Sequence, residues 1–485
     1  MKVSLLFFLL LSSILKAQVN NKNTVWCFGD SALIDFTIKS NPTVGNSSVR
    51  ARGSCASISN NNDSLLFYAQ TDHKIPGIYE GACVWNKNHN LMDRGDSLQG
   101  GGWYQEITIV PIPSIANKYF LFAVTIGGFP FGLWQSEINM SINNGLGKVV
   151  KKNKKICPYQ QVDGINAVKH GNGRDWWIFT RRFDKFLNGS NFWDIYLVSD
   201  SGVTDSVNQQ VGTANVAGLA FTAISKNGKR VAFVNNMNLI EVFDFDRCTG
   251  IISNPITIQQ QTPFAGDEFT GVAFSANGNV LYVSNYTTTS LIQYDLTAAN
   301  IGASKFIVYK DTNPNVIYGG LALAPDDKIY HTWWGCTHLG VINNPDSLSK
   351  QCNYAPNSFY LGGKHSNMSL PNNPNYELGP DTGSVCDSLG LGVETTPSTE
   401  NSLFSIVPNP STGQINLILL NDKTTQPTLN IKIFNYIGDV VYNANFKNVE
   451  RVTQLKLQHL KAGAYTIMVT LDGTTYKTNK LIIMK

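Results

Sequence analysis

The chain has 485 residues, of which 42% are hydrophobic, 11% aromatic and only 15% charged. This composition excludes a disordered chain and is typical of a protein with many short strands joined by turns. The formal net charge is +4, but residues 401–485 contribute +5 and Lys2 and Lys16 add +2, which leaves residues 18–400 at −3 and excludes the broad basic footprint that nucleic-acid binding needs.

The sequence begins with a short apolar run behind one basic residue. Lys2 precedes residues 3–11 (VSLLFFLLL), and the small residue Ala17 follows a few positions later. The run is too short to cross a membrane and has the pattern of a removed signal peptide. We therefore expect residues 1–17 to be cleaved, leaving an exported protein without a transmembrane segment.

The cysteines are widely spaced, which makes a zinc site improbable. In an exported protein their even number favours some disulfides. Cys336 and Cys352 are close enough in the chain to be the leading pair. The eight positions are 27, 55, 83, 157, 248, 336, 352 and 386.

The central region contains a repeat of about fifty residues. Each copy has a short strand of small residues, a turn and an aromatic-rich alternating strand, and Ala223, Ala273 and Ala322 mark equivalent positions 50 and 49 residues apart. The Asn-Gly pairs at 227–228 and 277–278 supply the positive φ that a two-residue hairpin turn requires. Three to four antiparallel strands per repeat form the blade of a β-propeller.

The repeat predicts an all-β fold, a β-propeller in which seven blades fit best and six or eight remain alternatives. Its inner strands are expected near residues 57, 109, 167, 223, 273 and 322, with a seventh at 366–370. An outer strand from residues 25–38 would complete the seventh blade and close the ring, which removes two exposed sheet edges.

The strand signal fades after residue 371, where Pro, Asn, Gly, Ser and Thr predominate up to residue 403. We therefore expect the propeller to span 18–395 and a linker to span 396–404. Beyond the linker, residues 429–442 alternate between apolar and polar positions with a break at 437–439, which predicts a hairpin inside a small β-sandwich at 405–485.

The C-terminal segment carries a set of turn, strand-start and tail residues in a fixed order. They are Pro408, Asn409, Pro410, Gly413, Gly438, Gly463, Tyr465 and Lys485. This order resembles the type A C-terminal sorting domain found on cargo of the type IX secretion system of Bacteroidetes-type bacteria. The resemblance covers about 401–485 and implies interaction with the type IX machinery and delivery to the outer cell surface or the medium. Residues 26–29 and 84–89 also resemble secreted propeller proteins of these bacteria.

No nucleophile elbow, zinc-protease, Walker or dinucleotide motif is present. The Gly100-Gly101-Gly102 run is explained by a flexible loop. Four polar residues are expected a few positions before inner strands, where a propeller channel opens: Glu106, Asp163, Glu268 and His365.

Carboxylates that converge from different blades could bind Ca²⁺. Glu106, Asp163 and Glu268 are the candidate ligands. With His365 as general base, a calcium-bound water could hydrolyse an ester or lactone. The turn of the repeat is similar to that of lactonase-type propellers. Solvent-lining roles are the simpler interpretation of all four residues.

A second cluster contains His331, Trp333 and Trp334. Its aromatic rings could stack on a sugar or grip a peptide. Packing is the alternative, because blade three contains a similar Trp176-Trp177 doublet. The basic run at 148–155 (KVVKKNKK) is best explained as a solvated turn between strands, with an anionic-ligand patch as the alternative.

Two functions follow from these observations, and the sequence leaves open whether the protein is an enzyme. The leading hypothesis is an exported recognition or scaffold module whose partner is a surface protein, a glycan or an extracellular polymer. The alternative is a calcium-dependent, lactonase- or esterase-like hydrolase. Neither hypothesis involves nucleic acid, and calcium is the one cofactor considered.

Overall fold

The structure is a computed structural model that divides into two compact units, 1–382 and 383–485. It describes residues 22–72, 81–101, 103–125, 131–183, 189–262, 267–313, 315–387, 404–407, 409, 411–419, 428–435, 439–447, 452–471 and 474–483. The expected signal peptide therefore lies outside the described residues, as do positions 396–403 of the expected linker.

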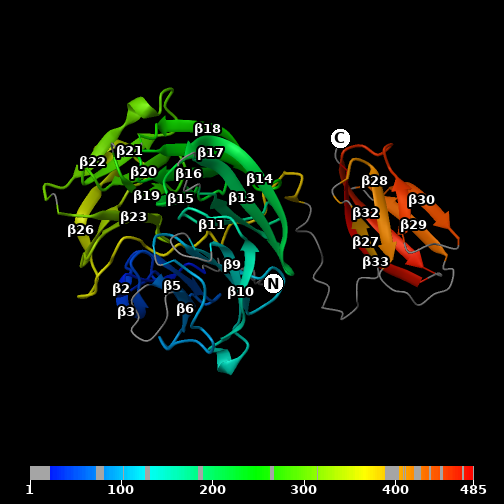
Figure 1. Cartoon of the computed structure of the whole chain (residues 1–485), viewed down its shortest axis with the longest axis horizontal. Helices are drawn as coiled ribbons and strands as arrows, with labels where there is room; N and C mark the ends of the chain where they lie inside the picture. Colours follow the sequence, from blue (N-terminus) through cyan, green and yellow to red (C-terminus); the bar gives the residue numbers. More distant parts are fainter. Residues whose placement is uncertain are drawn as a thin grey trace, which may run out of the picture. The chain divides into compact units, whose positions relative to one another are not determined.

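Unit 1 is a β-propeller whose described residues form seven antiparallel sheets around a centre (Figure 1). Consecutive strands pair with one another in every sheet, as in an up-and-down blade. The first two sheets have three strands each: β1 (Val25–Phe28), β2 (Asp30–Asp35) and β3 (Thr43–Arg50); and β4 (Ser54–Ser59), β5 (Leu65–Asp72) and β6 (Gly81–Asn86).

The other five sheets of unit 1 have four strands each. They are β7 (Ile107–Pro111), β8 (Lys118–Thr125), β9 (Gly132–Asn139) and β10 (Lys148–Cys157); β11 (Asn166–Lys169), β12 (Trp176–Arg181), β13 (Ser190–Ser199) and β14 (Gly202–Asn215); β15 (Ala220–Ile224), β16 (Arg230–Asn235), β17 (Ile240–Asp246) and β18 (Ile251–Gln259); β19 (Phe269–Phe274), β20 (Val280–Asn285), β21 (Ser290–Asp295) and β22 (Phe306–Lys310); and β23 (Tyr318–Leu323), β24 (Ile329–Trp333), β25 (His338–Ile342) and β26 (Tyr354–Tyr360).

Helical structure in the described residues is limited to three short 3₁₀ turns, η1 (Asn143–Gly145), η2 (Gly302–Ser304) and η3 (Ser349–Cys352). None of the helices formed by the described residues is long and apolar enough to cross a membrane.

The six predicted inner-strand positions all fall inside the first strand of a sheet, namely β4, β7, β11, β15, β19 and β23. The positive φ expected in these turns is confirmed, because Gly228, Gly278 and Asp327 have φ values of 73°, 76° and 62°. The predicted two-residue length is wrong, because Ser225 bonds Arg230 and Ser275 bonds Val280, which leaves four residues in each turn. Every residue of β4, β19 and β20 is buried, whereas most of β18 is not. The inner strands are therefore covered by neighbouring sheets on both faces, and polarity rises toward the rim.

The ring closes through residues 365–373, which run between β23 and β4. The Gly320 amide donates to the Met368 carbonyl (2.6 Å), and the Met368 amide donates to the Arg52 carbonyl (2.9 Å). Asp30 and His365 form an isolated bridge. The segment thus takes the inner position expected for 366–370, but without a regular strand. The N-terminus contributes the three strands β1–β3 rather than the single outer strand expected.

Two side chains, Asn372 and Gln105, form a plug that fills part of the channel. The Asn372 side chain donates to the carbonyls of Ile107 (3.0 Å) and Ile165 (2.8 Å) on two different sheets. Gln105 exchanges hydrogen bonds of 2.8 Å with the backbone of Thr222, which belongs to a third sheet. A cavity of about 180 Å³ remains beside this plug, lined by β11, β15, β19, β23 and residues 371–377.

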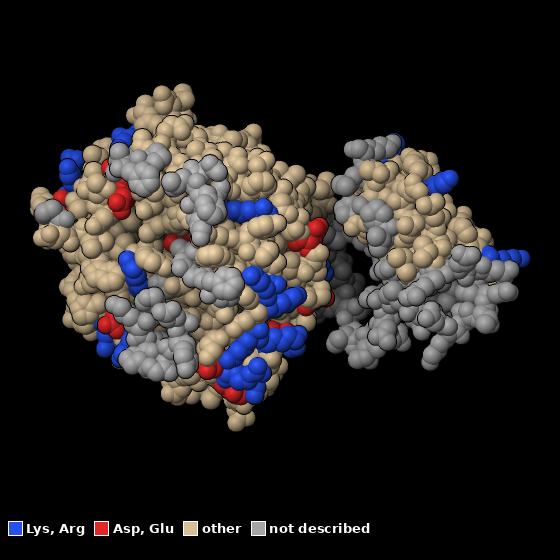
Figure 2. Space-filling view, in the orientation of Figure 1, with Lys and Arg blue, Asp and Glu red and all other residues tan. Residues whose placement is uncertain are grey.

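The basic run at 148–155 lies in strand β10, not in the solvated turn that we expected. β10 pairs with β9 and is the outermost strand of its sheet. Figure 2 shows Lys and Arg side chains gathered over the region where β9 and β10 lie in Figure 1.

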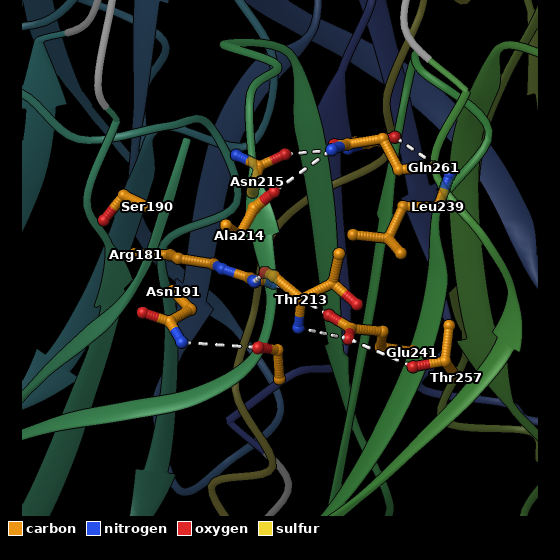
Figure 3. Close-up of polar contacts among 12 residues, drawn as sticks. Arg181, Ser190, Asn191, Thr213, Ala214, Asn215, Leu239, Glu241, Thr257 and Gln261 are labelled. Atoms are coloured by element: carbon orange, nitrogen blue, oxygen red, sulfur yellow. Dashed lines mark hydrogen bonds and ion pairs between the residues drawn. The ribbon is translucent and has the colours of Figure 1, made fainter. Parts of the chain in front are cut away.

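A buried polar network joins the β11–β14 sheet to the β15–β18 sheet (Figure 3). Arg181 and Glu241 form an ion pair of 3.2 Å whose side chains are 1% and 0% exposed. The Thr213 amide donates to Glu241 (2.7 Å), and Arg181 donates to the Thr213 carbonyl. The Arg181 guanidinium also lies over the Phe233 ring at 4.2 Å. Glu241 and the Thr213 carbonyl thus accept from the two terminal nitrogens of Arg181, while its Nε is buried without a hydrogen-bond partner.

The predicted pairing of Cys336 with Cys352 is wrong, because both are free and buried. Cys336 precedes β25, and Cys352 lies beyond its other end, at the last residue of η3. The full length of β25 therefore separates the two cysteines. Cys248 and Cys386 are the disulfide-bonded cysteines.

Unit 2 is a β-sandwich of two antiparallel sheets with a shared apolar core. The predicted hairpin is confirmed, since residues 429–434 pair with residues 440–446. One sheet contains β27 (Phe404–Val407), β28 (Gln414–Leu419) and β31 (Val452–Lys456); the other contains β29 (Leu429–Phe434), β30 (Val440–Phe446), β32 (Gly463–Leu471) and β33 (Thr474–Ile483).

Several expected landmarks of this unit have clear structural roles. Asn409 accepts a hydrogen bond from the Ile482 amide (2.8 Å), which ties the start of the sandwich to its last strand. Gly413 has a φ of 103°, Gly463 begins β32, and the Tyr465 hydroxyl donates to the Lys461 carbonyl (2.8 Å). Pro408, Pro410, Gly438 and Lys485 lie outside the described residues.

Candidate binding site at the channel mouth

One end of the channel gathers residues from several sheets. Because neighbouring strands are antiparallel, residues that precede a first strand and residues that follow a second strand lie at the same end of their sheets. Arg52 and residues 103–106 precede β4 and β7, and Trp334 follows β24. We call this end the mouth.

The mouth holds a cation among aromatic rings. The Arg52 guanidinium carbon lies 4.6 Å from the ring centroid of Trp103, 5.2 Å from that of Tyr104 and 5.7 Å from that of Trp334. We call these four residues the Arg52 cluster. Each distance lies within the range of a cation–π interaction. The cluster therefore draws on three different sheets to hold one positive charge.

The Arg52 cluster is partly open to solvent and partly fixed. Trp334 is 45% exposed and Tyr104 is 4% exposed, while Arg52 and Trp103 are half-buried. Tyr104 also stacks on Phe221, with ring centroids 5.7 Å apart. Because Phe221 lies in β15, this contact anchors the cluster across the channel.

Arg52 has unused hydrogen-bonding capacity. Its Nε is buried and has no hydrogen-bond partner, and within the described part of the chain the guanidinium forms no ion pair with a carboxylate. A guanidinium presents five N–H donors in a planar fork. The mouth thus offers charge and donors beside exposed aromatic faces.

Two of the candidate carboxyl residues, Glu106 and Asp163, lie near one another beneath this cluster. Burial raises the pKa of Asp163 well above its usual range, and the neighbouring Glu106 charge raises it further. The Tyr104 amide and the Arg52 charge act in the opposite direction. Asp163 is only 1% exposed, and this burial disfavours its charged form.

Glu106 is held by several donors. Its Oε2 accepts hydrogen bonds from the Thr71 hydroxyl (3.0 Å), the Gly101 amide (3.1 Å) and the Trp103 amide (3.0 Å). A Cβ at Gly101 would lie 2.3 Å from Glu106 Oε1, so this position needs glycine. Gly101 and Trp103 therefore hold a buried carboxylate through their amides.

The other two candidates are more exposed. Glu268 is half-buried and bonds through its backbone to Thr287 and Tyr286, and His365 is exposed. Among the described residues, no group of three or more His, Cys, Asp or Glu side chains lies close enough to hold a metal ion. The calcium site and the role of His365 as general base stay predictions.

The predicted aromatic cluster separates into two parts. Trp334 belongs to the mouth, whereas His331 is fully buried and bonds the Tyr354 hydroxyl at 3.0 Å. Burial lowers the pKa of His331 to about 3. Trp333 is half-buried and packs on Tyr318. His331 and Trp333 therefore stabilise the blade, as Trp176 and Trp177, which are 1% and 3% exposed, do in theirs.

Sequence reasoning missed Arg52, Trp103 and Tyr104. The available signal was position, because all three lie just before a predicted inner strand. That rule was applied to carboxylates and histidine alone. Applied to aromatic and basic residues as well, it indicates the Arg52 cluster.

Comparison with known proteins identifies one part of the chain. Residues 405–484 match the family model described as a secretion system C-terminal sorting domain. No match was found among curated proteins. A putative 6-phosphogluconolactonase from Bacteroides uniformis is 11% identical (TM-score 0.37; 80% of this chain, 94% of that one). The Pseudomonas aeruginosa periplasmic gluconolactonase PpgL is 10% identical (TM-score 0.36; 86% and 99%).

The β-propeller domain of Cps50 (Swd1) from Myceliophteria thermophila is 10% identical (TM-score 0.36; 64% and 94%). Likenesses this distant carry no argument about activity. The sorting domain shows the destination instead: the chain is a β-propeller protein with a type IX C-terminal sorting domain, which directs it to the cell surface or the extracellular space.

Proposed function

We propose that the protein is an exported recognition module whose mouth binds an extracellular glycan. The observation that supports this most directly is the Arg52 cluster, in which a cation with an unpartnered buried donor lies beside two partly exposed tryptophans. Export through the sorting domain supports a partner that lies outside the cell.

The chemistry of the cluster suits a sugar ring. The faces of Trp103 and Trp334 supply flat apolar area for the C–H face of a pyranose, and the Arg52 fork can donate to hydroxyl or carboxylate oxygens. This favours a glycan with an acceptor-rich edge.

The test is a glycan array probed with the exported full-length protein. Trp334→Ala should weaken specific hits about tenfold or more, the loss expected for truncating a central aromatic contact. Tyr360→Ala is the matched control, because Tyr360 is 55% exposed and lies on the outer strand β26. A blank array, or equal losses in the two variants, would contradict the proposal.

The Glu106–Asp163 pair supports a second candidate, a calcium-dependent lactonase- or esterase-like hydrolase. Two carboxyl groups with divergent environments are typical of acid–base sites. Against this, Asp163 is almost fully buried and Gln105 and Asn372 fill the channel beside it. If the hydrolase hypothesis holds, chelation of calcium and Asp163→Asn each abolish lactone turnover.

A further inference from the structure

We infer that the outer edge formed by β9 and β10 is a docking surface for an extended acidic polysaccharide, separate from the mouth. The first observation is the composition of β10. It holds five lysines among ten residues: Lys148, Lys151, Lys152, Lys154 and Lys155. The other outermost strands of unit 1 hold at most one basic residue each, Arg50 in β3 and Lys310 in β22, with none in β6, β14, β18 or β26.

The difference in lysine content between β10 and the other outermost strands tests whether edge protection explains the charge. Lysines on an outermost strand prevent pairing between sheets of different molecules. Six other outer strands of the same propeller have that need, and they meet it with at most one basic residue apiece. Edge protection therefore does not account for five lysines on one strand.

The lysines are only partly neutralised. Lys148 pairs with Asp93 (2.8 Å), Lys152 with Asp96 (3.1 Å), and Lys118 and Lys151 share Glu137 (3.4 and 2.7 Å). Arg94 also lies on this edge, where it donates a hydrogen bond to the Val150 carbonyl. Asp200 lines an adjacent hollow. Seven cationic side chains thus face four acidic ones, within a region whose overall charge is −3.

Two of the lysines are free to meet a ligand. Lys154 and Lys155 are exposed and form no ion pair with a carboxylate in the described part of the chain. The Lys155 ammonium instead lies over the Trp134 ring, 5.1 Å from its centroid. Beside Lys151 and Lys154 is a hollow of about 290 Å³ lined also by Lys118 and Gln135. The surface therefore combines exposed cations, a recess and an aromatic ring.

The shape of the surface favours a polymer over a small anion. A strand of ten residues extends over about 33 Å, at roughly 3.3 Å per residue. The lysines occupy the part of it from Lys148 to Lys155, about 23 Å. Cations over that distance can contact successive charges of one linear chain, and they gain affinity from the release of its counterions. The sorting domain takes the protein outside the cell, where acidic polysaccharide supplies such charge.

The probe is a linear polygalacturonate titrated into the exported full-length protein at low and at physiological salt. Lys151→Gln/Lys154→Gln/Lys155→Gln should weaken binding about tenfold and flatten its salt dependence, because three contacts with the polyanion are lost. Lys305→Gln/Lys310→Gln/Lys350→Gln removes the same charge from exposed lysines elsewhere in unit 1. That control should stay close to the original affinity. The basic residues of 401–485 are unchanged in both variants.

Three outcomes would overturn the inference. They are no binding by the original protein, equal weakening in the two triple variants, and binding to vesicles of anionic lipid but not to polygalacturonate. Trp334→Ala should leave this binding intact. Failure of the mouth proposal and failure of the edge proposal are therefore distinguishable.

Discussion

At the residue scale, Asp163 is a buried carboxyl group beneath the mouth whose ionisation lowers the stability of the fold. Its folded-state pKa is raised above the unfolded value of 3.8, chiefly by burial. The protonated form therefore stabilises the fold below the unfolded pKa, and this contribution is lost as pH rises through the folded pKa. Above the unfolded pKa, the free energy of unfolding is lower, because the folded protein must either bury the Asp163 charge or bind a proton that the unfolded chain has released.

Asp163→Asn should remove that cost. The variant should be more stable than the original protein at pH 7.5 and nearly equal to it at pH 3.5, and melting temperatures at the two pH values measure the difference. Glu106→Gln is the contrasting variant and should destabilise the protein, because Glu106 Oε2 accepts three hydrogen bonds and an uncharged amide oxygen accepts them more weakly than a carboxylate. Stabilisation by Glu106→Gln, or a pH-independent effect of Asp163→Asn, would argue against this account.

At the scale of elements, the blades are held together by polar contacts as well as by apolar packing. The Arg181–Glu241 pair joins β12 to β17 and is shielded from water. Burial lowers the pKa of Arg181, and Glu241 opposes that shift. Buried pairs of this kind are expensive to break because one charge is left uncompensated.

Glu241→Leu should therefore destabilise the propeller by about 3–5 kcal/mol. The double variant Arg181→Met/Glu241→Leu should recover part of that loss, since methionine can pack on Trp193 and Phe233, which Arg181 now contacts. Denaturant unfolding of both variants provides the comparison. If the double variant is as unstable as the single one, then lost packing and not the buried charge determines the effect.

At the scale of the whole molecule, the repeat determined most of what could be predicted. Small-residue strands followed by turns place six inner strands, and the turns after three of them have positive φ at Gly228, Gly278 and Asp327. The C-terminal sandwich was predictable for the same reason, because its alternating strands and turn residues are local signals.

Features that depend on distant contacts were not predictable. Residues 366–370 lie at an inner position through hydrogen bonds to Arg52 and Gly320, and no local pattern shows that they lack a regular ladder. Arg52, Trp103 and Trp334 meet only because three sheets converge. The lysine run has the composition of a turn, yet pairing with β9 makes it a strand.

The central claim is that the mouth receives the ligand, and hydroxyl-radical footprinting of the exported protein tests it most directly. With a glycan that binds on the array, oxidation of Trp103 and Trp334 should fall, while Tyr360, which is 55% exposed on β26, should be oxidised as before. Protection confined to other surfaces, with Trp103 and Trp334 oxidised equally in the free and bound protein, would contradict the account.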